Sequence, residues 1–125
     1  MKALVIDSSL TNRERIISLL MSVNNIGIIS QAEDKETAER MIEDLQSEFV
    51  VLNTYMHQQQ GPRANSIALL KKIKRHNPST VVVMAEDLPH TPNQNAYLTL
   101  GAEFFIDPSR NLDRWVKVIE ELLQS

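Results

Sequence analysis

Cysteine is missing from the 125-residue chain, so disulfides and thiolate metal sites are excluded. Glycine is scarce, with three residues, and the chain has no glycine-rich phosphate loop. No hydrophobic run approaches the roughly 20 apolar residues that span a membrane, and the run after Lys2 ends at Asp7, too early for a signal-peptide core. We therefore expect a cytoplasmic protein without membrane contact, folded as one domain over residues 1–125.

The charge balance gives no sign of a nucleic-acid partner. The formal net charge is -3, and the basic residues are spread among acidic ones. One dense basic stretch, at the end of an expected helix, comprises Lys71, Lys72, Lys74 and Arg75. Cations suit the negative end of the helix dipole, so we expect a solvated helix end there rather than a contact with nucleic-acid phosphates.

Five short apolar runs alternate with segments of helical periodicity. The runs cover residues 3–6, 26–29, 49–52, 81–84 and 104–106. They are continuous and rich in valine, isoleucine and phenylalanine, which is typical of strands buried on both faces of a parallel sheet. Right-handed crossovers leave few topologies for five β-α units. The pattern therefore predicts an α/β fold of the flavodoxin-like (βα)5 type, a three-layer sandwich with strand order 2-1-3-4-5.

Local signals mark several helix ends. Asp34 is expected to cap the second helix, and Gly101 is expected to follow a short helix over 95–100. Ser109 or Asn111 is expected to cap the last helix. These signals place the loops between the five runs, and the chain shows no repeat, linker or low-complexity tract.

The topology alone indicates where a site would lie. In open parallel sheets, ligands bind beyond the carboxyl ends of the strands, where the strand order reverses. In the expected order this point lies between the first strand, ending at Asp7 and Ser8, and the third, ending at Asn53. The neighbouring strand ends add the other candidates, which are Met84, Glu86, Asp107 and Pro108.

The same strand ends carry a resemblance to the receiver domain of bacterial two-component response regulators, over the whole chain. Residues 5–9 (VIDSS) resemble the first strand end of that family, where adjacent acids hold Mg²⁺. Residues 50–53 (VVLN) resemble the third strand, which in the family ends on the phospho-accepting aspartate. Residues 100–105 (LGAEFF) resemble the entry to the fifth strand, which places the family's aromatic switch at Phe105.

Compared with the family, the phosphorylation pocket is degenerate. Asp7 is kept, but Ser8 replaces the second acid and Asn53 replaces the acceptor. An acyl phosphate needs a carboxylate nucleophile, and Mg²⁺ favours carboxylate oxygens. Asp7 is then at most a weak Mg²⁺ ligand, and we expect no metal site, no cofactor and no enzymatic activity. We expect instead that Asn53 donates a hydrogen bond to Asp7 and accepts one from a backbone N–H.

The family's hydroxyl residue after the fourth strand and its lysine after the fifth are also missing. Matching the strands places Met84 at the hydroxyl position, whereas counting back from Gly101 places Glu86 there. Counting forward from Gly101 places Pro108 at the lysine position, whereas matching the proline places Asp107 there. None of these side chains supplies a hydroxyl or an ammonium group.

Other groups of polar residues give weaker indications of a functional site. The histidines His57, His76 and His90 lie far apart and form no helical i, i+4 pair, so we expect no metal site from them. No G-x-S-x-G motif accompanies the serines at positions 8 and 9, which argues against a hydrolase. The resemblance to receivers therefore stays the main functional indication.

The last helix has a wide apolar face. The expected core stripe comprises Leu112, Val116, Ile119 and Leu123. The side chains that widen it are Trp115, Val118 and Leu122. The extra surface is either covered by the neighbouring helix around Tyr97 or forms a protein contact surface, which a tryptophan favours. The resemblance favours contact, because helix 4, strand 5 and helix 5 form the usual dimer and output face of receivers. The interface candidates are then Tyr97, Trp115, Val118 and Leu122.

The sequence therefore predicts a receiver-like signalling module that is independent of phosphorylation and acts through protein–protein contact. Its partner would be another protein, with homodimerisation as the simplest assembly. Two alternatives stay open. The chain could accept a phosphoryl group at a non-standard residue such as Ser8 or Asp7, or it could sense a small ligand in the altered pocket.

Overall fold

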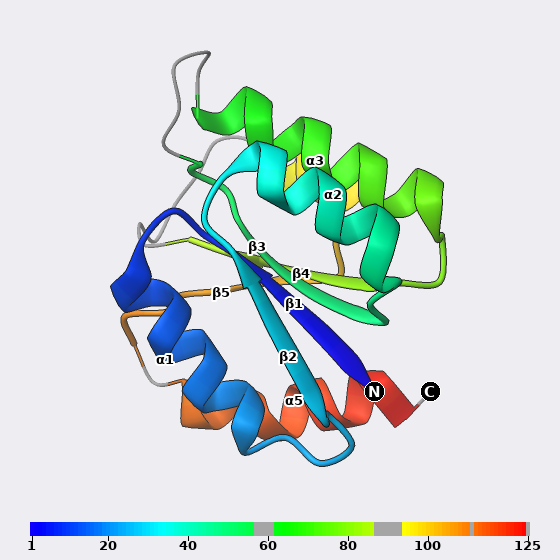
Figure 1. Ribbon diagram of the computed structural model, residues 1–125. Coiled ribbons are helices and arrows are strands. Elements are labelled where there is room, and N and C mark those ends of the chain that lie inside the picture. The colour runs from blue at the N-terminus through cyan, green and yellow to red at the C-terminus, as the bar shows by residue number, and fades with distance from the viewer. Residues whose placement is uncertain (57–61, 87–93, 111, 125) are drawn as a thin grey trace.

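The strand order is the one that the sequence predicts. In this computed structural model, which describes residues 1–56, 62–86, 94–110 and 112–124, parallel strands form one sheet in the order β2-β1-β3-β4-β5 (Figure 1). Along the chain the elements are β1 Lys2–Ile6, α1 Leu10–Met21, β2 Ile28–Ala32, α2 Lys35–Leu45, β3 Phe49–Asn53, α3 Pro62–His76, β4 Val81–Ala85, α4 Gln94–Thr99, β5 Phe104–Ile106 and α5 Asp113–Gln124. The flavodoxin-like (βα)5 arrangement is confirmed.

The central strands β1, β3 and β4 are buried on both faces because their side chains are apolar almost throughout. Every residue of β3 is buried, and in β1 and β4 every residue after the first is buried. The register aligns the strand ends, since Ile6 lies beside Leu52 and Asn53 lies beside Ala85. Polar side chains that follow these strands therefore meet at one edge of the sheet.

The second strand corrects the prediction. It runs over Ile28–Ala32 instead of 26–29, and it is an edge strand paired with β1. Ser30 is half-buried and Gln31 is exposed, so polar side chains are tolerated there. The Arg13 Nε donates a hydrogen bond to Gln31 Oε1 at 2.8 Å. Edge strands need no continuous apolar run, which is why hydrophobicity alone misplaces this strand.

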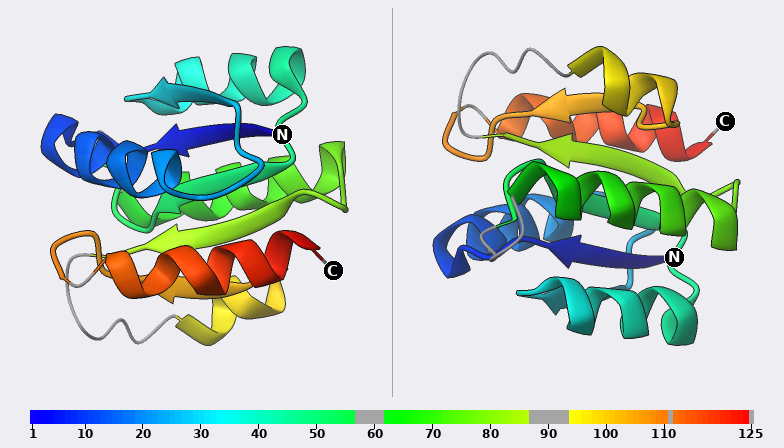
Figure 2. Two further views of the ribbon diagram at one scale, coloured as in Figure 1. Left: turned by 90° about the horizontal axis from the view of Figure 1, so that it is seen from below. Right: turned by 90° about the horizontal axis from the view of Figure 1, so that it is seen from above.

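Helices cover both faces of the sheet (Figure 2). α1 and α5 pack on one face, and α2, α3 and α4 pack on the other. Successive strand residues alternate between the two cores, with Phe49 and Val51 under α1 and α5, and Val50 and Leu52 on the other side. Both chain termini lie at the end of the sheet opposite the candidate site (Figure 1).

Side-chain caps begin the first two helices. Ser9 Oγ accepts a hydrogen bond from the Asn12 backbone N–H at 3.2 Å. Asp34 Oδ1 accepts one from the Thr37 backbone N–H at 2.7 Å, which confirms the expected cap of α2. This N–H holds the pKa of Asp34 below its usual value, because it stabilises the ionised carboxylate.

The start of α5 differs from the prediction. The helix begins at Asp113, so Ser109 is too far away to cap it. The backbone N–H and the hydroxyl of Ser109 donate instead to the Asp107 carboxylate. Asn111, the other expected cap, lies outside the described residues.

Gly101 is required by the backbone of the turn after α4. Its φ of 111° lies in the region that favours glycine, as expected for a residue that ends a helix. A Cβ added there would lie 3.0 Å from Cε of Lys74. Lys74 is held over the turn because its Nζ donates to the Thr80 carbonyl at 2.6 Å and to Glu103 Oε1 at 3.3 Å.

We expect Gly101→Ala to lower the free energy of unfolding by about 1 to 3 kcal/mol, because alanine is strained at this φ and its methyl group meets Lys74. Gly27→Ala is the matched control, since a Cβ at Gly27 meets no heavy atom within 4 Å. We expect the control to change the stability by less than about 1 kcal/mol. Urea denaturation measures both, and equal losses would show that the turn at Gly101 is not constrained.

Candidate functional site

The ends of β1 and β3 meet through a carboxylate and an amide. Asp7 and Asn53 are buried, with 1% and 3% of their surface exposed. Asn53 Nδ2 donates a hydrogen bond to Asp7 Oδ2 at 2.8 Å. The backbone N–H of Tyr55 donates to Asn53 Oδ1 at 2.7 Å, so the nitrogen and the oxygen of the amide are both engaged. The hydrogen bonding expected from the sequence is confirmed.

The other oxygen of Asp7 is bound by the start of α1. Asp7 Oδ1 accepts a hydrogen bond from the Ser9 backbone N–H at 2.8 Å. Ser8, which stands where the resemblance places a second acid, is half-buried between them. The negative charge of Asp7 is therefore stabilised by N–H donors of the protein itself.

This arrangement does not fit Mg²⁺, the cation that the resemblance implies. Mg²⁺ needs oxygen ligands in near-octahedral geometry, usually with carboxylates among them. Asn53 turns its Nδ2 toward Asp7 and its Oδ1 toward the backbone, so no second side-chain oxygen is presented to the carboxylate by this residue. In the part of the chain that the structure describes, no group of three Asp, Glu or His side chains could hold a metal ion.

Arg13 is a site residue that the sequence analysis missed. Its side chain is charged, yet the residue is only 7% exposed. Its Nη1 donates to the backbone carbonyl of Asp7 at 2.7 Å, and its Nη2 lies 4.0 Å from the Glu33 carboxylate at the end of β2. Arg13 therefore ties α1 to two strand ends. A signal existed, since Arg13 stands three residues before Ile16 on the buried face of α1.

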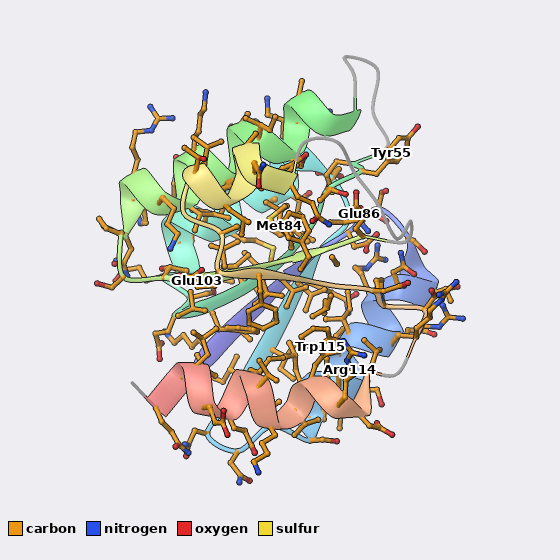
Figure 3. The ribbon with its side chains drawn as sticks, turned by 180° about the vertical axis from the view of Figure 1, so that it is seen from behind. Tyr55, Met84, Glu86, Glu103, Arg114 and Trp115 are labelled. Atoms are coloured by element: carbon orange, nitrogen blue, oxygen red, sulfur yellow. The ribbon has the colours of Figure 1, made fainter. Side chains whose placement is uncertain are left out.

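The two candidates for the missing hydroxyl position lie in different surroundings. Met84 is fully buried in the core between the sheet and α3, whereas Glu86 lies just beyond the end of β4, near Tyr55 (Figure 3). Glu86 is 6% exposed, and its Oε1 accepts a hydrogen bond from Thr54 Oγ1 at 3.4 Å. The hydroxyl that binds Glu86 therefore comes from Thr54, the residue after Asn53, and not from a residue of β4.

The corner after β5 carries an acid. β5 ends at Ile106, and Asp107 is the first residue beyond it. The Asp107 carboxylate accepts a hydrogen bond from the Ser109 N–H at 2.8 Å and lies 3.7 Å from Nε of Arg110. Pro108, the other candidate for the lysine position, is buried. This corner therefore carries a carboxylate, paired with Arg110, close to where the resemblance implies a lysine.

Phe105 and Tyr97 pack edge to face, with ring centroids 5.9 Å apart and an interplanar angle of 80°. Phe105 also lies beside Met84 in the strand register. Tyr97 is 0% exposed, so its assignment to the contact surface is wrong. A tyrosine can be buried here because its hydroxyl is 2.8 Å from the Ser66 hydroxyl and shares a hydrogen bond with it.

The apolar excess of α5 is largely covered by the protein itself. Trp115 stacks on Phe104 of β5 with ring centroids 5.4 Å apart, and the Arg114 guanidinium lies 4.7 Å from the centroid of the indole (Figure 3). Leu122 packs against the same core and is half-buried. Val118 remains 40% exposed. The cover therefore comes from β5 rather than from α4, and Val118 is the residue of this set that reaches the solvent most.

The basic stretch at the end of α3 is partly structural. Lys72 Nζ lies 2.7 Å from the Glu43 carboxylate of α2, and Lys74 Nζ lies 3.3 Å from Glu103. Two of the four cations therefore join neighbouring elements instead of being solvated. The Lys72 ammonium holds the pKa of Glu43 below its usual value, through the hydrogen bond and the charge.

His76 is exposed at the end of α3, whereas His57 and His90 lie outside the described residues. Over the described ranges, no helix is long and apolar enough to cross a membrane.

Curated relatives match the chain in sequence, although no family model matches it. It is 28% identical over 123 residues to protein-glutamate methylesterase/protein-glutamine glutaminase 3 of Geobacter sulfurreducens. It is 30% identical over 127 residues to a protein-glutamate methylesterase/protein-glutamine glutaminase of Idiomarina loihiensis. Each alignment includes 96% of this chain and 31% of the relative, so the chain spans about a third of the length of these relatives.

Solved structures show the fold directly. The receiver domain of NtrX from Brucella abortus is 27% identical with a TM-score of 0.81, and the match covers 98% of each chain. The REC domain of RcsB from Salmonella enterica is 19% identical with a TM-score of 0.83, covering 100% of this chain and 89% of that one. The response regulator domain of Thermotoga maritima CheB is 21% identical with a TM-score of 0.72, covering 99% and 94%. The chain therefore has the fold of response-regulator receiver domains.

We expect Asn53→Asp to destabilise the protein more at neutral pH than in mildly acidic buffer. The new carboxylate would face Asp7 where an N–H now donates at 2.8 Å, and two buried carboxylates repel each other. The pair would then bind a proton with a pKa raised above that of the unfolded chain. The stability of the Asn53→Asp variant is therefore retained at low pH and is lost as the pH rises through the raised pKa. We expect a loss of about 2 kcal/mol at neutral pH.

The matched control for this prediction is Asn53→Ala, which removes the same hydrogen bonds without adding a charge. We expect its loss of stability relative to wild type to vary less with pH. Denaturant unfolding across a pH series measures both variants. The same pH dependence in both would contradict the idea that the amide prevents repulsion between carboxylates.

Proposed function

We propose that the chain is a receiver-type signalling module that acts through protein–protein contact and does not use aspartyl phosphorylation. The observation that carries the proposal is the 2.8 Å hydrogen bond from Asn53 to Asp7 between the ends of β1 and β3. An amide at this position is uncharged and is a poor nucleophile, so an acyl phosphate does not form on it. The fold supports the signalling part of the proposal, because it is the fold of response-regulator receivers.

The electrostatics of the strand ends support the same proposal. Phosphoryl transfer depends on cations that stabilise the charge of the transferred group. The ends of β1, β4 and β5 carry Asp7, Glu86 and Asp107, which are all acids. Of the nearby cations, Arg13 directs its Nη1 to the backbone carbonyl of Asp7, and Arg110 Nε lies 3.7 Å from the Asp107 carboxylate. This edge of the sheet therefore disfavours an anionic phosphodonor.

Modification of Asp7 itself is disfavoured by its surroundings. Its carboxylate oxygens accept hydrogen bonds from Ser9 and from Asn53, each at 2.8 Å. An attack on a phosphodonor would break at least one of these bonds in a site with 1% exposure. The hydrogen bonding supports a pocket that is closed by its own side chains.

We expect wild-type protein incubated with acetyl phosphate and Mg²⁺ to show no phosphoryl adduct by intact mass spectrometry, because the acceptor position is an amide. Asn53→Asp is expected to be labelled slowly or not at all, since it lacks the second acid, the hydroxyl and the lysine. Asn53→Ala is the control variant, and a phosphorylatable receiver in the same buffer is the positive control. A stoichiometric adduct on wild type would overturn the proposal, and peptide mapping would then distinguish Ser8 from Asp7.

We infer that the contact surface lies over α4, β5 and α5. Leu98 of α4 is 42% exposed and Val118 of α5 is 40% exposed, and β5 forms the edge of the sheet between these helices. Trp115, stacked between Phe104 and Arg114, gives this surface a rigid aromatic base. Homodimerisation through one such face on each copy is the simplest assembly.

We expect Val118→Glu to weaken self-association by about tenfold or more, because it places a charge in an apolar contact. Ile28→Glu is the matched control, since Ile28 is 57% exposed on β2, at the opposite edge of the sheet from β5. Val118 is a better probe than Trp115, whose truncation would also disturb the packing on Phe104. Analytical ultracentrifugation at matched concentrations compares the variants. A wild type that is monomeric at high micromolar concentration, or equal behaviour of the variants, would exclude this surface.

A further inference from the structure

The helix α4 is held on the sheet by one buried side chain. It comprises Gln94–Thr99, and Tyr97 is its buried residue, whereas neighbours such as Leu98 are exposed. After Tyr97, the next residues that pack in this core are Leu100 and Ala102, which follow the helix. Apart from a hydrogen bond of 3.5 Å from Gln94 Nε2 to Glu86 Oε2, the attachment of the helix itself depends on Tyr97.

The hydroxyl of Tyr97 belongs to a buried polar network. It lies 2.8 Å from Ser66 Oγ, and Ser66 Oγ donates to the backbone carbonyl of Thr54 at 2.8 Å. The Tyr97 hydroxyl also lies 3.5 Å from that carbonyl. These three residues are at most 1% exposed. A buried network of this kind is stabilising when it is complete, and it is costly to break because the remaining polar groups lose their partners away from water.

This network joins α4 to the edge of the sheet that carries the candidate site. Thr54 follows Asn53 directly, and its backbone N–H donates to the Ala85 carbonyl at 2.9 Å. Ser66 lies in α3, so the hydrogen bonds run from the end of β3 through α3 to α4. Phe105 packs edge-on against the Tyr97 ring and extends the contact to β5. The position of Tyr97 is thus determined by elements on three sides.

We propose that Tyr97 is a latch whose hydroxyl, through Ser66 and the Thr54 carbonyl, fastens α4 to the strand end that carries Asn53. Loss of the hydroxyl would let α4 open locally while the central strands stay folded, since α1, α2, α3 and α5 also cover the sheet. The inference concerns how α4 is held, and it stands whether or not the pocket can be phosphorylated.

Hydrogen exchange measured by NMR tests the latch in the intact chain. The probes are the amides of Leu100, Gly101 and Ala102, which donate to the carbonyls of Ala96, Leu98 and Tyr97. In Tyr97→Phe we expect these amides to exchange about tenfold faster than in wild type, because the ring is kept and one buried hydrogen bond is lost. Amides of β1 are expected to change by less than about twofold.

Two further variants complete the test. Tyr55→Phe removes the hydroxyl of a tyrosine that is 51% exposed, and we expect exchange at the probe amides to stay at the wild-type rate. Ser66→Ala should accelerate the probes as Tyr97→Phe does. The double variant should accelerate them by less than the product of the single effects, because both changes break one network.

The latch is refuted if the probe amides of Tyr97→Phe exchange at the wild-type rate. It is also refuted if β1 exchanges faster by the same factor, which would indicate a global loss of stability. If the two accelerations of exchange multiply in the double variant, Ser66 and Tyr97 act separately. That result would contradict the proposal that they belong to one network.

Discussion

Burial of β1, β3 and β4 on both faces is the constraint on which the rest of this structure depends. A strand covered on both sides admits apolar side chains along its length, so polar groups gather where the strand ends. At the end of β3 the Asn53 amide is almost fully buried and must find partners within the protein. It finds the Asp7 carboxylate and the Tyr55 backbone N–H. The chemistry of the edge is therefore dominated by the need to satisfy buried polar groups.

An amide beside a carboxylate changes the electrostatics of this edge. Two carboxylates at the same distance would need a cation or a shared proton, whereas Asn53 supplies an N–H donor and adds no charge. The guanidinium of Arg13 donates a hydrogen bond to the backbone carbonyl of Asp7 and is not directed at an incoming anion. The Asp7 carboxylate is therefore bound by N–H donors of the protein itself, which supports the proposal that this edge does not use an exchangeable cation or a phosphoryl group.

The helices α4 and α5, which flank β5, are attached to the sheet in different ways. α5 buries a broad apolar face against β5, with Trp115 stacked on Phe104, so its position rests on packing over many atoms. α4 is short and exposed, and it is anchored by Tyr97 and a hydrogen-bond network that reaches the end of β3. The attachment of α5 is spread over many contacts, whereas that of α4 is concentrated in one buried side chain. This contrast supports the proposal that a single side chain can release α4.

The sequence by itself determined the number of strands, the order of the strands in the sheet and the pairing of the Asn53 amide with the Asp7 carboxylate. It could do so because continuous apolar runs and the residues that follow them are local features. Only the tertiary structure decided the extent of β2, the burial of Tyr97, the role of Arg13 and the cover over Trp115. Each of these depends on which element lies opposite. An edge strand tolerates polar residues, and a tyrosine is buried when its hydroxyl shares a hydrogen bond with that of a distant serine. An arginine is buried when neighbouring strands offer it a backbone carbonyl oxygen and a side-chain amide oxygen. Such partners are far apart in the sequence, and folding alone brings them together.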